Sequence, residues 1–326
     1  MTNSEFHNLQ AARIVAGTLT LLSREIHEVG PPASLWSPAL SPDFIRETAA
    51  RVSRGEALPL WVEERHPARG LAIYVPLPWE SYFFGFGCVG LLGPFMVVED
   101  QRDRENRVRK LASLAIEQGR REQRSLIALK TFHDPAVLRG FLAENFILAE
   151  IGAALRGPIP ETDRSFERPA GFLFLESEDL PDLTEEVVAG LDDFFYDGHY
   201  RNDPDLGPEV ARRLWDQVAR EDLSGRANPA LVLWDRKKDR PVGLATVRIV
   251  GHEAELSILA VSVHYRGRGL GRLILGETLK RLQGRANLLK VEAASYNLPA
   301  LNLYQSMGLR LAAPLVALHH HLTYER

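Results

Sequence analysis

The strongest hydrophobic pattern of the chain lies in its second half. An apolar, β-rich run from Leu256 to Val263 leads into a glycine-rich turn, and apolar residues then recur at helical spacing up to Leu282. Turn residues and a glycine stop signal delimit the neighbouring elements. The predicted elements are strand 171–176, helices 182–196 and 208–221, hairpin strands 231–234 and 242–250 around the turn 235–241, strand 253–263, helix 270–282, strand 288–294, helix 298–307, which ends at Gly308, and strand 309–323.

The first half of the chain also alternates between helical and strand patterns. Its predicted elements are helices 5–28 and 42–54, strands 59–63, 70–76 and 86–98, helix 101–119, strand 124–130, helix 134–144 and strand 146–155. The segment 156–170 is rich in proline and charge and has neither period, so it is the best linker candidate. We therefore predict an α/β fold of the α+β type with a mixed sheet, in three parts: a smaller N-terminal α/β domain over 1–158, a linker over 159–169, and a second domain over 170–326.

Composition narrows the classes of partner. The 326 residues carry a net charge of -4, which gives no global reason to expect nucleic acid. No stretch reaches the roughly 20 apolar residues that span a bilayer, and the apolar segment 14–22 resembles an amphipathic helix more than a signal peptide. The single cysteine, Cys88, excludes an internal disulfide and a multi-cysteine zinc site. We expect a cytoplasmic protein without nucleic-acid or membrane partners.

The glycine-rich turn has the composition of a phosphate-binding site. The turn is Arg266-Gly267-Arg268-Gly269-Leu270-Gly271, and a helix follows it directly. Free N–H groups and the positive end of the helix dipole at such a turn both favour an anion. Glycines let the backbone approach the phosphates closely, and arginines add charge and forked donors.

The element order and two motifs of the second domain resemble the GNAT superfamily of N-acetyltransferases. The first motif is the turn 266–271, and the second is Asn297 followed by Ala300, Leu303-Tyr304 and Gly308 at family spacing. The resemblance implies that acetyl-CoA or another acyl-CoA is the co-substrate and that strands 256–263 and 288–294 splay apart to admit it. It further implies pyrophosphate binding by the turn and pantetheine pairing with the strand before it. The implied coenzyme contacts are Leu259, Ala260, Val261, Arg266, Gly267, Arg268, Gly269, Leu270, Gly271, Arg272 and Asn297.

The same resemblance gives Tyr304 the catalytic role. In this superfamily the tyrosine at its position protonates the departing thiolate, although a core tyrosine is the alternative. Asn297 also fits a helix N-cap. The base that deprotonates the amine is left open between Glu253, Glu255, Glu80 and ordered water, because each carboxylate also fits a surface role.

Two other features carry no chemistry in this interpretation. Cys88 has no evident histidine partner, and a lone cysteine is usually a small buried apolar residue. Three consecutive histidines, His319 to His321, alternate between the faces of a predicted strand, so all three cannot converge on one ion. We therefore predict no metal site.

Two segments suggest the kind of acceptor. The segment 77–87, Leu-Pro-Trp-Glu-Ser-Tyr-Phe-Phe-Gly-Phe-Gly, resembles dTDP-fucosamine acetyltransferase and related TDP-amino-sugar N-acyltransferases, with Glu80 in place of an aspartate. The segment 199–205, with Arg213-Leu-Trp215 after it, resembles the loop between the first helices of that family. The candidate acceptor residues are Glu80, Phe83, Phe84, Tyr200 and Arg201.

These resemblances imply N-acyl transfer to a nucleotide-linked amino sugar or a similar small amine. A protein or peptide N-acetyltransferase and a non-catalytic acyl-CoA-binding paralogue are the alternatives. The acyl length of the donor and the oligomeric state are left open, with a homodimer as one alternative.

A weak internal repeat concerns the origin of the first domain. Strand 124–130, then Pro135-Ala136-Val137, parallels strand 288–294, then Pro299-Ala300-Leu301, at an offset of 164 residues. The hypothesis is that the first domain is a degenerate half of the same fold, which binds no coenzyme and walls the acceptor site. Chance similarity of two β-α-β units is the alternative.

Overall fold

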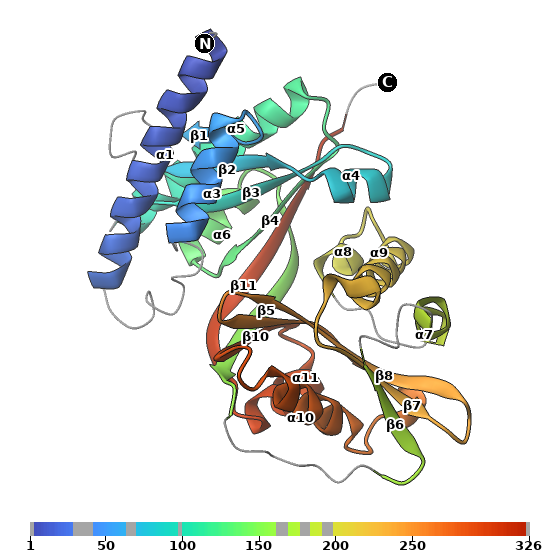
Figure 1. Ribbon diagram of the computed structural model, residues 1–326. Helices are drawn as coiled ribbons and strands as arrows, with labels where there is room; N and C mark the ends of the chain where they lie inside the picture. Colours follow the sequence, from blue (N-terminus) through green and yellow to red (C-terminus); the bar gives the residue numbers. More distant parts are fainter. Residues whose placement is uncertain are drawn as a thin grey trace. The chain divides into compact units, whose positions relative to one another are not determined.

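The computed structural model describes residues 3–28, 42–62, 70–96, 100–160, 169–176, 183–190 and 198–323 (Figure 1). The chain divides into two compact units: Met1–Ile151 with Ala312–Arg326, and Gly152–Leu311. The boundaries fall inside strands β5 (Ile147–Pro158) and β11 (Arg310–His321), so each of these strands contributes residues to both units. The last residues of the chain therefore group with the first unit, whereas the prediction assigns them to the second domain.

The described part of the first unit begins with the helices α1 and α3 and continues with the antiparallel strands β1, β2 and β3. Neighbouring strands follow the order β1-β2-β3-β4-β11. All of these pairs are antiparallel except β3 with β4, which the long helix α5 connects as a parallel crossover. The elements are α1 (Asn3–Glu28), α3 (Pro42–Ser53), β1 (Leu58–Trp61), β2 (Leu71–Pro76), α4 (Pro78–Phe84), β3 (Cys88–Phe95), α5 (Gln101–Arg121), β4 (Leu126–Phe132) and α6 (Pro135–Leu142).

Strand β2 shows how the first unit buries both faces of its sheet. Leu71, Ile73 and Val75 belong to one hydrophobic cluster, with residues of α1 and α3. Ala72 and Tyr74 belong to another, with residues of α5 and α6. Alternate side chains of a strand point to opposite faces, so helices cover the sheet on both sides (Figure 1).

The second unit repeats this succession of elements after an added first strand. Its strands follow the order β5-β10-β9-β8-β7-β6. The helix α10 connects β9 to the parallel strand β10, as α5 connects β3 to β4. The elements are β6 (Phe172–Glu176), α7 (Thr184–Gly190), α8 (His199–Asn202), α9 (Pro208–Glu221), β7 (Ala230–Asp235), β8 (Arg240–Val250), β9 (Glu253–Val261), α10 (Leu270–Leu282), β10 (Leu288–Ala294) and α11 (Leu298–Ser306), with a π-helical turn over Asp222–Arg226 and a 3-10 turn over Val263–Tyr265.

The sheet of the second unit is also covered on both faces. One cluster contains buried residues of α10 and α11, such as Ile274 and Tyr304. The other contains Val187 of α7 and Ala219 of α9. The face with α10 and α11 and the face with α7 and α9 therefore have separate hydrophobic cores.

The mixed α/β fold predicted from the sequence is confirmed, and so is the hairpin of β7 and β8. The short helices α4 and α8 were not predicted. Of the predicted helix 182–196, the structure describes helix only over Thr184–Gly190, and residues 191–197 lie outside the described part. Residues 161–168 of the predicted linker also lie outside it. Gly308 has a φ of 98°, a left-handed conformation that ends α11 as predicted.

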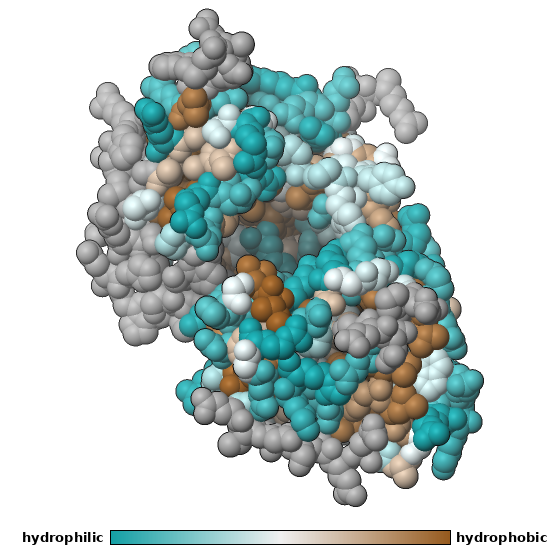
Figure 2. Space-filling model, viewed as in Figure 1, coloured by the Kyte–Doolittle hydropathy of each residue, from teal (hydrophilic) through white to brown (hydrophobic). Residues whose placement is uncertain are grey.

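The face of the molecule in Figure 2 is mostly hydrophilic, with hydrophobic residues in separate patches. Exposed hydrophobic residues of the second unit include Val250, Leu298 and Leu311. Single exposed hydrophobic residues are normal on soluble surfaces. Within the described residues, no helix has the length and hydropathy that crossing a membrane requires.

A tight helix contact in the first unit leads to a stability prediction. A Cβ atom at Gly140 of α6 would lie 2.6 Å from the Cβ of Val108 and 3.0 Å from the carbonyl oxygen of Glu105, both on α5. We expect Gly140→Ala to lower the free energy of unfolding by about 1–3 kcal/mol, because the two helices must separate. Urea unfolding measures this. Leu142→Ala on the exposed face of the same helix is the control, with an expected change within about 0.5 kcal/mol, and an equal effect of both variants would contradict the contact.

Candidate active site

The central strands β9 and β10 of the second unit pair over only three positions. Leu288, Leu289 and Lys290 face Glu253, Ala254 and Glu255 in parallel register. Beyond these positions β9 continues to pair with β8, and β10 continues to pair with β5 along its whole length. Both strands therefore stay in the sheet on their outer sides and part from each other on their inner sides. The splay that the sequence resemblance implied is present.

A β-bulge in β9 lies where the two strands begin to part. In the pairing of β9 with β8, Val247 faces Leu256 and Thr246 faces Ile258, so Ser257 is the extra residue. Leu256 belongs to the hydrophobic cluster on the α10 face, whereas Ile258 packs against the cluster on the α9 face. The bulge thus reverses the alternation of side chains along β9.

The glycine-rich turn after β9 contains two glycines in the left-handed conformation. Gly267 and Gly269 both have a φ of 75°, and a Cβ atom at either would meet no atom within 4 Å. These glycines therefore serve the left-handed conformation and leave the space in front of the turn open. At Gly271 an added Cβ atom would instead lie 3.3 Å from the Cδ2 of Leu303. The absence of a side chain at this position therefore lets α10 pack closely against α11.

The N-terminus of α10 has no side-chain cap. Its N-cap residue is Gly269, which has no side chain to accept a hydrogen bond from the first turn. The N–H groups of the first turn therefore need an acceptor from outside the helix. Arg266 and Arg268 are exposed beside this turn, and each donates one hydrogen bond to a backbone oxygen, of Val261 (3.0 Å) and His264 (3.0 Å) respectively. The turn is thus a cationic, donor-rich surface.

Tyr304 lies in α11 with 5% of its surface exposed, in the same hydrophobic cluster as Leu256 of β9 and Val291 of β10. Within the described residues, no side chain hydrogen-bonds its hydroxyl. Burial raises the pKa of this phenol, so it remains protonated at neutral pH. A protonated, unengaged phenol beside the parted strands suits the predicted donation of a hydrogen bond to a leaving group.

Asn297 is the N-cap of α11, as predicted. Its side-chain oxygen accepts a hydrogen bond from the N–H of Ala300 at 3.2 Å. The preceding residue Tyr296 accepts a hydrogen bond at its hydroxyl from the side-chain amide of Asn202 at 3.1 Å. This contact, which the sequence analysis missed, connects α8 to the loop between β10 and α11. Tyr200 of the same short helix packs against His199, with the ring centroids 4.0 Å apart.

The three candidate carboxylates have different surroundings. Glu253 forms an ion pair with Lys290. Glu255 is exposed, and within the described residues it has no ion-pair partner. Glu80 lies in α4 of the first unit, where burial raises the pKa of its carboxyl. Only Glu255 combines a free carboxylate with a position at the end of the β9–β10 pairing.

The short helix α4 of the first unit exposes aromatic side chains. Phe83 stacks on Trp79 with ring centroids 5.5 Å apart, and Phe84 packs edge-on against Phe83 at 6.1 Å. Tyr82 is 89% exposed. Cys88 next to this helix is buried, and burial together with the charge of Glu80 raises the pKa of its thiol to about 12. The thiol is therefore inert, as expected.

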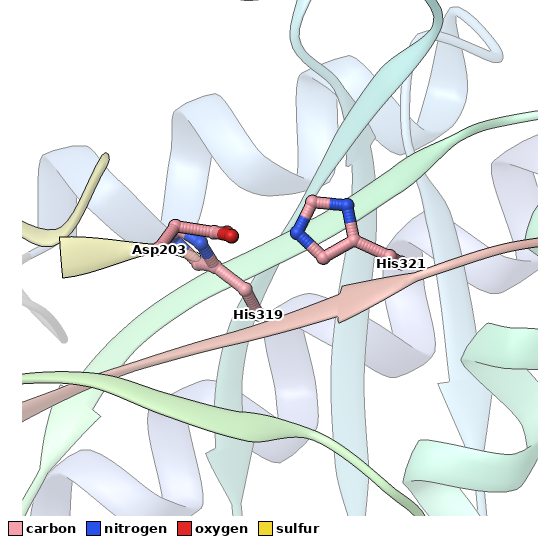
Figure 3. A group of neighbouring side chains, drawn as sticks. All are labelled: Asp203, His319 and His321. Atoms are coloured by element: carbon pink, nitrogen blue, oxygen red, sulfur yellow. The ribbon is translucent and has the colours of Figure 1, made fainter. Parts of the chain in front are cut away.

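The consecutive histidines occupy opposite faces of β11. His320 points one way, where its Nδ1 lies 3.2 Å from the carbonyl oxygen of Asn145. His319 and His321 share the other face and bring ring nitrogens within 4.8 Å of each other. Figure 3 labels these two imidazoles together with Asp203, a residue of the second unit. All three histidines do not converge, as predicted, but His319 and His321 do, which the sequence pattern did not predict.

The second unit, with its parted central strands beside a glycine turn at a helix N-terminus, has the GNAT fold. Residues 189–309 match the sequence model of the Acetyltransferase (GNAT) family. Domains of this family use acetyl-CoA as co-substrate and transfer the acyl group to an amine. No curated protein matches the chain.

Solved structures show a similar fold over most of the chain. A tandem GNAT protein from the clavulanic acid biosynthesis pathway has a TM-score of 0.57 at 16% identity, covering 96% of this chain and 96% of that one. A GCN5-related N-acetyltransferase from Sphaerobacter thermophilus has a TM-score of 0.58 at 13% identity, covering 84% and 85%. A glucosamine N-acetyltransferase region of a fungal β-N-acetylglucosaminidase has a TM-score of 0.52 at 13% identity, covering 78% and 31%. The tandem arrangement agrees with two units that repeat one succession of elements.

The described residues fit an acyl-CoA on two counts. The uncapped, cationic turn offers donors for a pyrophosphate, and the parted edge of β9 offers main-chain groups to an amide-containing arm. Leu259 and Ala260 are partly exposed along this edge. The carbonyl oxygen of Val261 accepts one hydrogen bond from Arg266, and its second lone pair can still accept one from the arm.

The turn can be tested against a glycine of the same conformation elsewhere. Gly284, at the other end of α10, has a φ of 71° and the same open surroundings as Gly269. We expect Gly269→Val to raise the Kd for coenzyme A about tenfold or more, because the valine strains the turn and occupies the space of the phosphates. Isothermal titration measures this. Gly284→Val carries similar backbone strain and should bind coenzyme A as the wild type does, so equal weakening in both variants would refute the turn as the binding site.

Proposed function

We propose that the protein is an acyl-CoA-dependent N-acyltransferase that acts on a small amine. The observation that carries this proposal is the parting of β9 and β10 directly before the uncapped turn at Gly269. This arrangement offers an acyl-CoA both an anion site and a main-chain edge. The cytoplasmic location, the lack of nucleic-acid partners and the homodimer alternative stay predictions from the sequence.

We propose one role for each group of the site. The first-turn N–H groups of α10, with Arg266, Arg268 and Arg272, bind the pyrophosphate, and the edge of β9 over 259–261 aligns the pantetheine arm. The acceptor amine attacks the thioester carbonyl, and the carbon–sulfur bond then breaks. Tyr304 donates a hydrogen bond and the proton to the departing sulfur. The raised pKa of Tyr304 keeps this proton in place up to alkaline pH.

Glu255 is the carboxylate that we propose as the base. It takes the proton of the attacking ammonium, either directly or through an ordered water. Its rivals are less suitable, since Glu253 is neutralised by Lys290 and Glu80 belongs to the other unit.

For the acceptor, we propose an amino sugar or a similar small amine. Aromatic rings such as those of Trp79 and Phe83 bind sugar rings and nucleobases by stacking, and Glu80, Phe84, Tyr200 and Arg201 remain the accompanying candidates. The fungal region with a similar fold is named for glucosamine acetylation. A protein or peptide amine is the second candidate. A coenzyme A-release assay over TDP-amino sugars, polyamines and peptides separates the two.

We further propose that the first unit is a degenerate copy of the fold that binds no coenzyme. Its helix α5, the counterpart of α10, begins with Asp100, whose carboxylate accepts a hydrogen bond from the N–H of Asp103 at 2.8 Å. This helix N-terminus already holds a negative charge, which repels phosphate. At the offset of 164 residues, Gly140 takes the place of Tyr304, so the phenol is absent as well.

The role of Tyr304 leads to a kinetic prediction. We expect Tyr304→Phe to lower kcat about 100-fold or more, because the phenyl ring cannot donate a proton to the leaving sulfur. The Kd for coenzyme A should stay within about twofold, since the ring still fills its place in the core. Turnover assays and titration calorimetry measure both. Wild-type kcat in this variant would show that Tyr304 is only a core residue.

The asymmetry between the two helix N-termini predicts the coenzyme stoichiometry. Titration calorimetry with coenzyme A should give one site per chain, because α10 begins without a side-chain cap whereas its counterpart α5 begins with the carboxylate of Asp100. Gly269→Val should remove this single site. Two sites of comparable affinity per chain would contradict the assignment of the first unit as a degenerate copy.

A further inference from the structure

An ion-pair network anchors the bulge of β9 from the α9 face of the sheet. Asp222, in the π-helical turn after α9, is fully buried with 0% of its surface exposed. Arg226 binds it from the same turn, with Nε 2.7 Å from Oδ1. Arg248 of β8 binds it from the sheet, with Nε and Nη2 3.3 and 3.2 Å from the same oxygen. Thr246 donates to the other carboxylate oxygen at 2.8 Å.

Arg248 extends this network to the bulge itself. Its Nη2 also donates a hydrogen bond to the Oγ of Ser257 at 3.0 Å. A guanidinium has five N–H donors, and these contacts use the one at Nε and the two at Nη2. Within the described residues, nothing accepts from Nη1. The two N–H groups at Nη1 are thus left for a ligand, and the side chain as a whole is 34% exposed.

Glu255 of β9 lies on the same face of the sheet as Arg248 and forms no ion pair with it. Glu255 is its direct partner across the β8–β9 pair, and cross-strand Cβ atoms lie about 4.5–5.5 Å apart. No ion pair joins the two side chains, although both are described, and Asp222 holds the guanidinium from the other side. A free carboxylate and a half-free guanidinium thus stand side by side where β9 and β10 part.

We propose that Arg248 is an anion-binding residue for the acceptor, which is therefore an amine with a carboxylate or phosphate group within a few bonds. This inference rests on the proposed N-acyltransferase function. In this arrangement Glu255 takes the proton of the amine, and Nη1 of Arg248 binds the anionic group, so that the amine points at the thioester. Guanidinium groups pair with both carboxylates and phosphates through parallel hydrogen bonds.

Matched acceptor pairs that differ in charge test this proposal. The pairs are glucosamine 6-phosphate with glucosamine, O-phosphoethanolamine with ethanolamine, and alanine with alaninamide. For the wild type we expect the anionic member of at least one pair to have a kcat/KM about tenfold higher or more. Arg248→Gln should abolish this preference by raising the KM of the anionic acceptor, with the KM for acetyl-CoA unchanged. Arg248→Lys should restore part of it.

Arg226→Gln is the matched control variant. It also removes a cation from Asp222, but the remaining hydrogen bonds of Arg226 go to Glu221 and to the carbonyl oxygen of Val218, away from β9. It should therefore keep the preference for the anionic acceptor. The proposal is overturned if the wild type shows no charge preference in any pair, or if Arg248→Gln impairs both members of a pair equally. Thermal unfolding of each variant separates these outcomes from loss of the fold.

A binding measurement separates this proposal from the function on which it rests. If coenzyme A binds but no amine is acylated, the proposed function fails. Titration of O-phosphoethanolamine into the coenzyme complex then decides the anion site, which requires binding by the wild type and its loss in Arg248→Gln. Equal binding by both proteins, or binding by neither, refutes the site.

Discussion

The strand pair β9–β10 imposes the constraint on which the site depends. Each strand is held in the sheet by its outer neighbour, β8 or β5, while the pair itself shares register over only three positions. Main-chain groups on the inner edge of β9 after Glu255 therefore lack the partners that a continuous sheet would provide. Backbone N–H and C=O groups must be satisfied by something, and a ligand that carries amides of its own can satisfy them. The open edge and the uncapped turn that follows it are consecutive along the chain, so one extended ligand can use both.

The bulge at Ser257 determines which side chains of β9 point to each face of the sheet beside this edge. Without the extra residue, Ile258 would face α10 like Leu256 does, and the side chains of β9 would keep one alternation throughout. With it, Ser257 and Ile258 both face the α9 side, where Arg248 binds the serine and is itself fixed by Asp222. A buried carboxylate is costly unless it is paired and hydrogen-bonded, and here the cost is offset by two arginines and a threonine. The network therefore holds a local irregularity of the sheet in one arrangement.

The sequence predicted the features that have local signals. The glycine turn, the N-cap at Asn297 and the stop at Gly308 follow from residues within a few positions of each other. The splay of the strands came from family resemblance, since the pairing of β10 with β5 joins segments that are distant in the sequence. The bulge has a faint signal, because apolar residues occupy 258 to 261 without alternation. The contacts of Arg248 with Asp222 and of Asn202 with Tyr296 join residues 26 and 94 positions apart, and a single sequence contains no information on such distances.

The two units show how one succession of elements can give a crossover helix with or without a side-chain cap at its N-terminus. In both, a strand passes through a helix to a parallel strand, and the N–H groups of the first helical turn need acceptors. In the first unit Asp100 supplies the acceptor, which stabilises the helix by about a few tenths of a kcal/mol relative to a glycine N-cap. In the second unit the N-cap is a glycine, and that stabilisation is left to whatever anion binds there. The two units differ here in one residue, the N-cap of the helix, which is Asp100 in the first unit and Gly269 in the second. An anion-binding turn is therefore easily lost by substitution, while the packing of helix on sheet that forms the fold is unaffected.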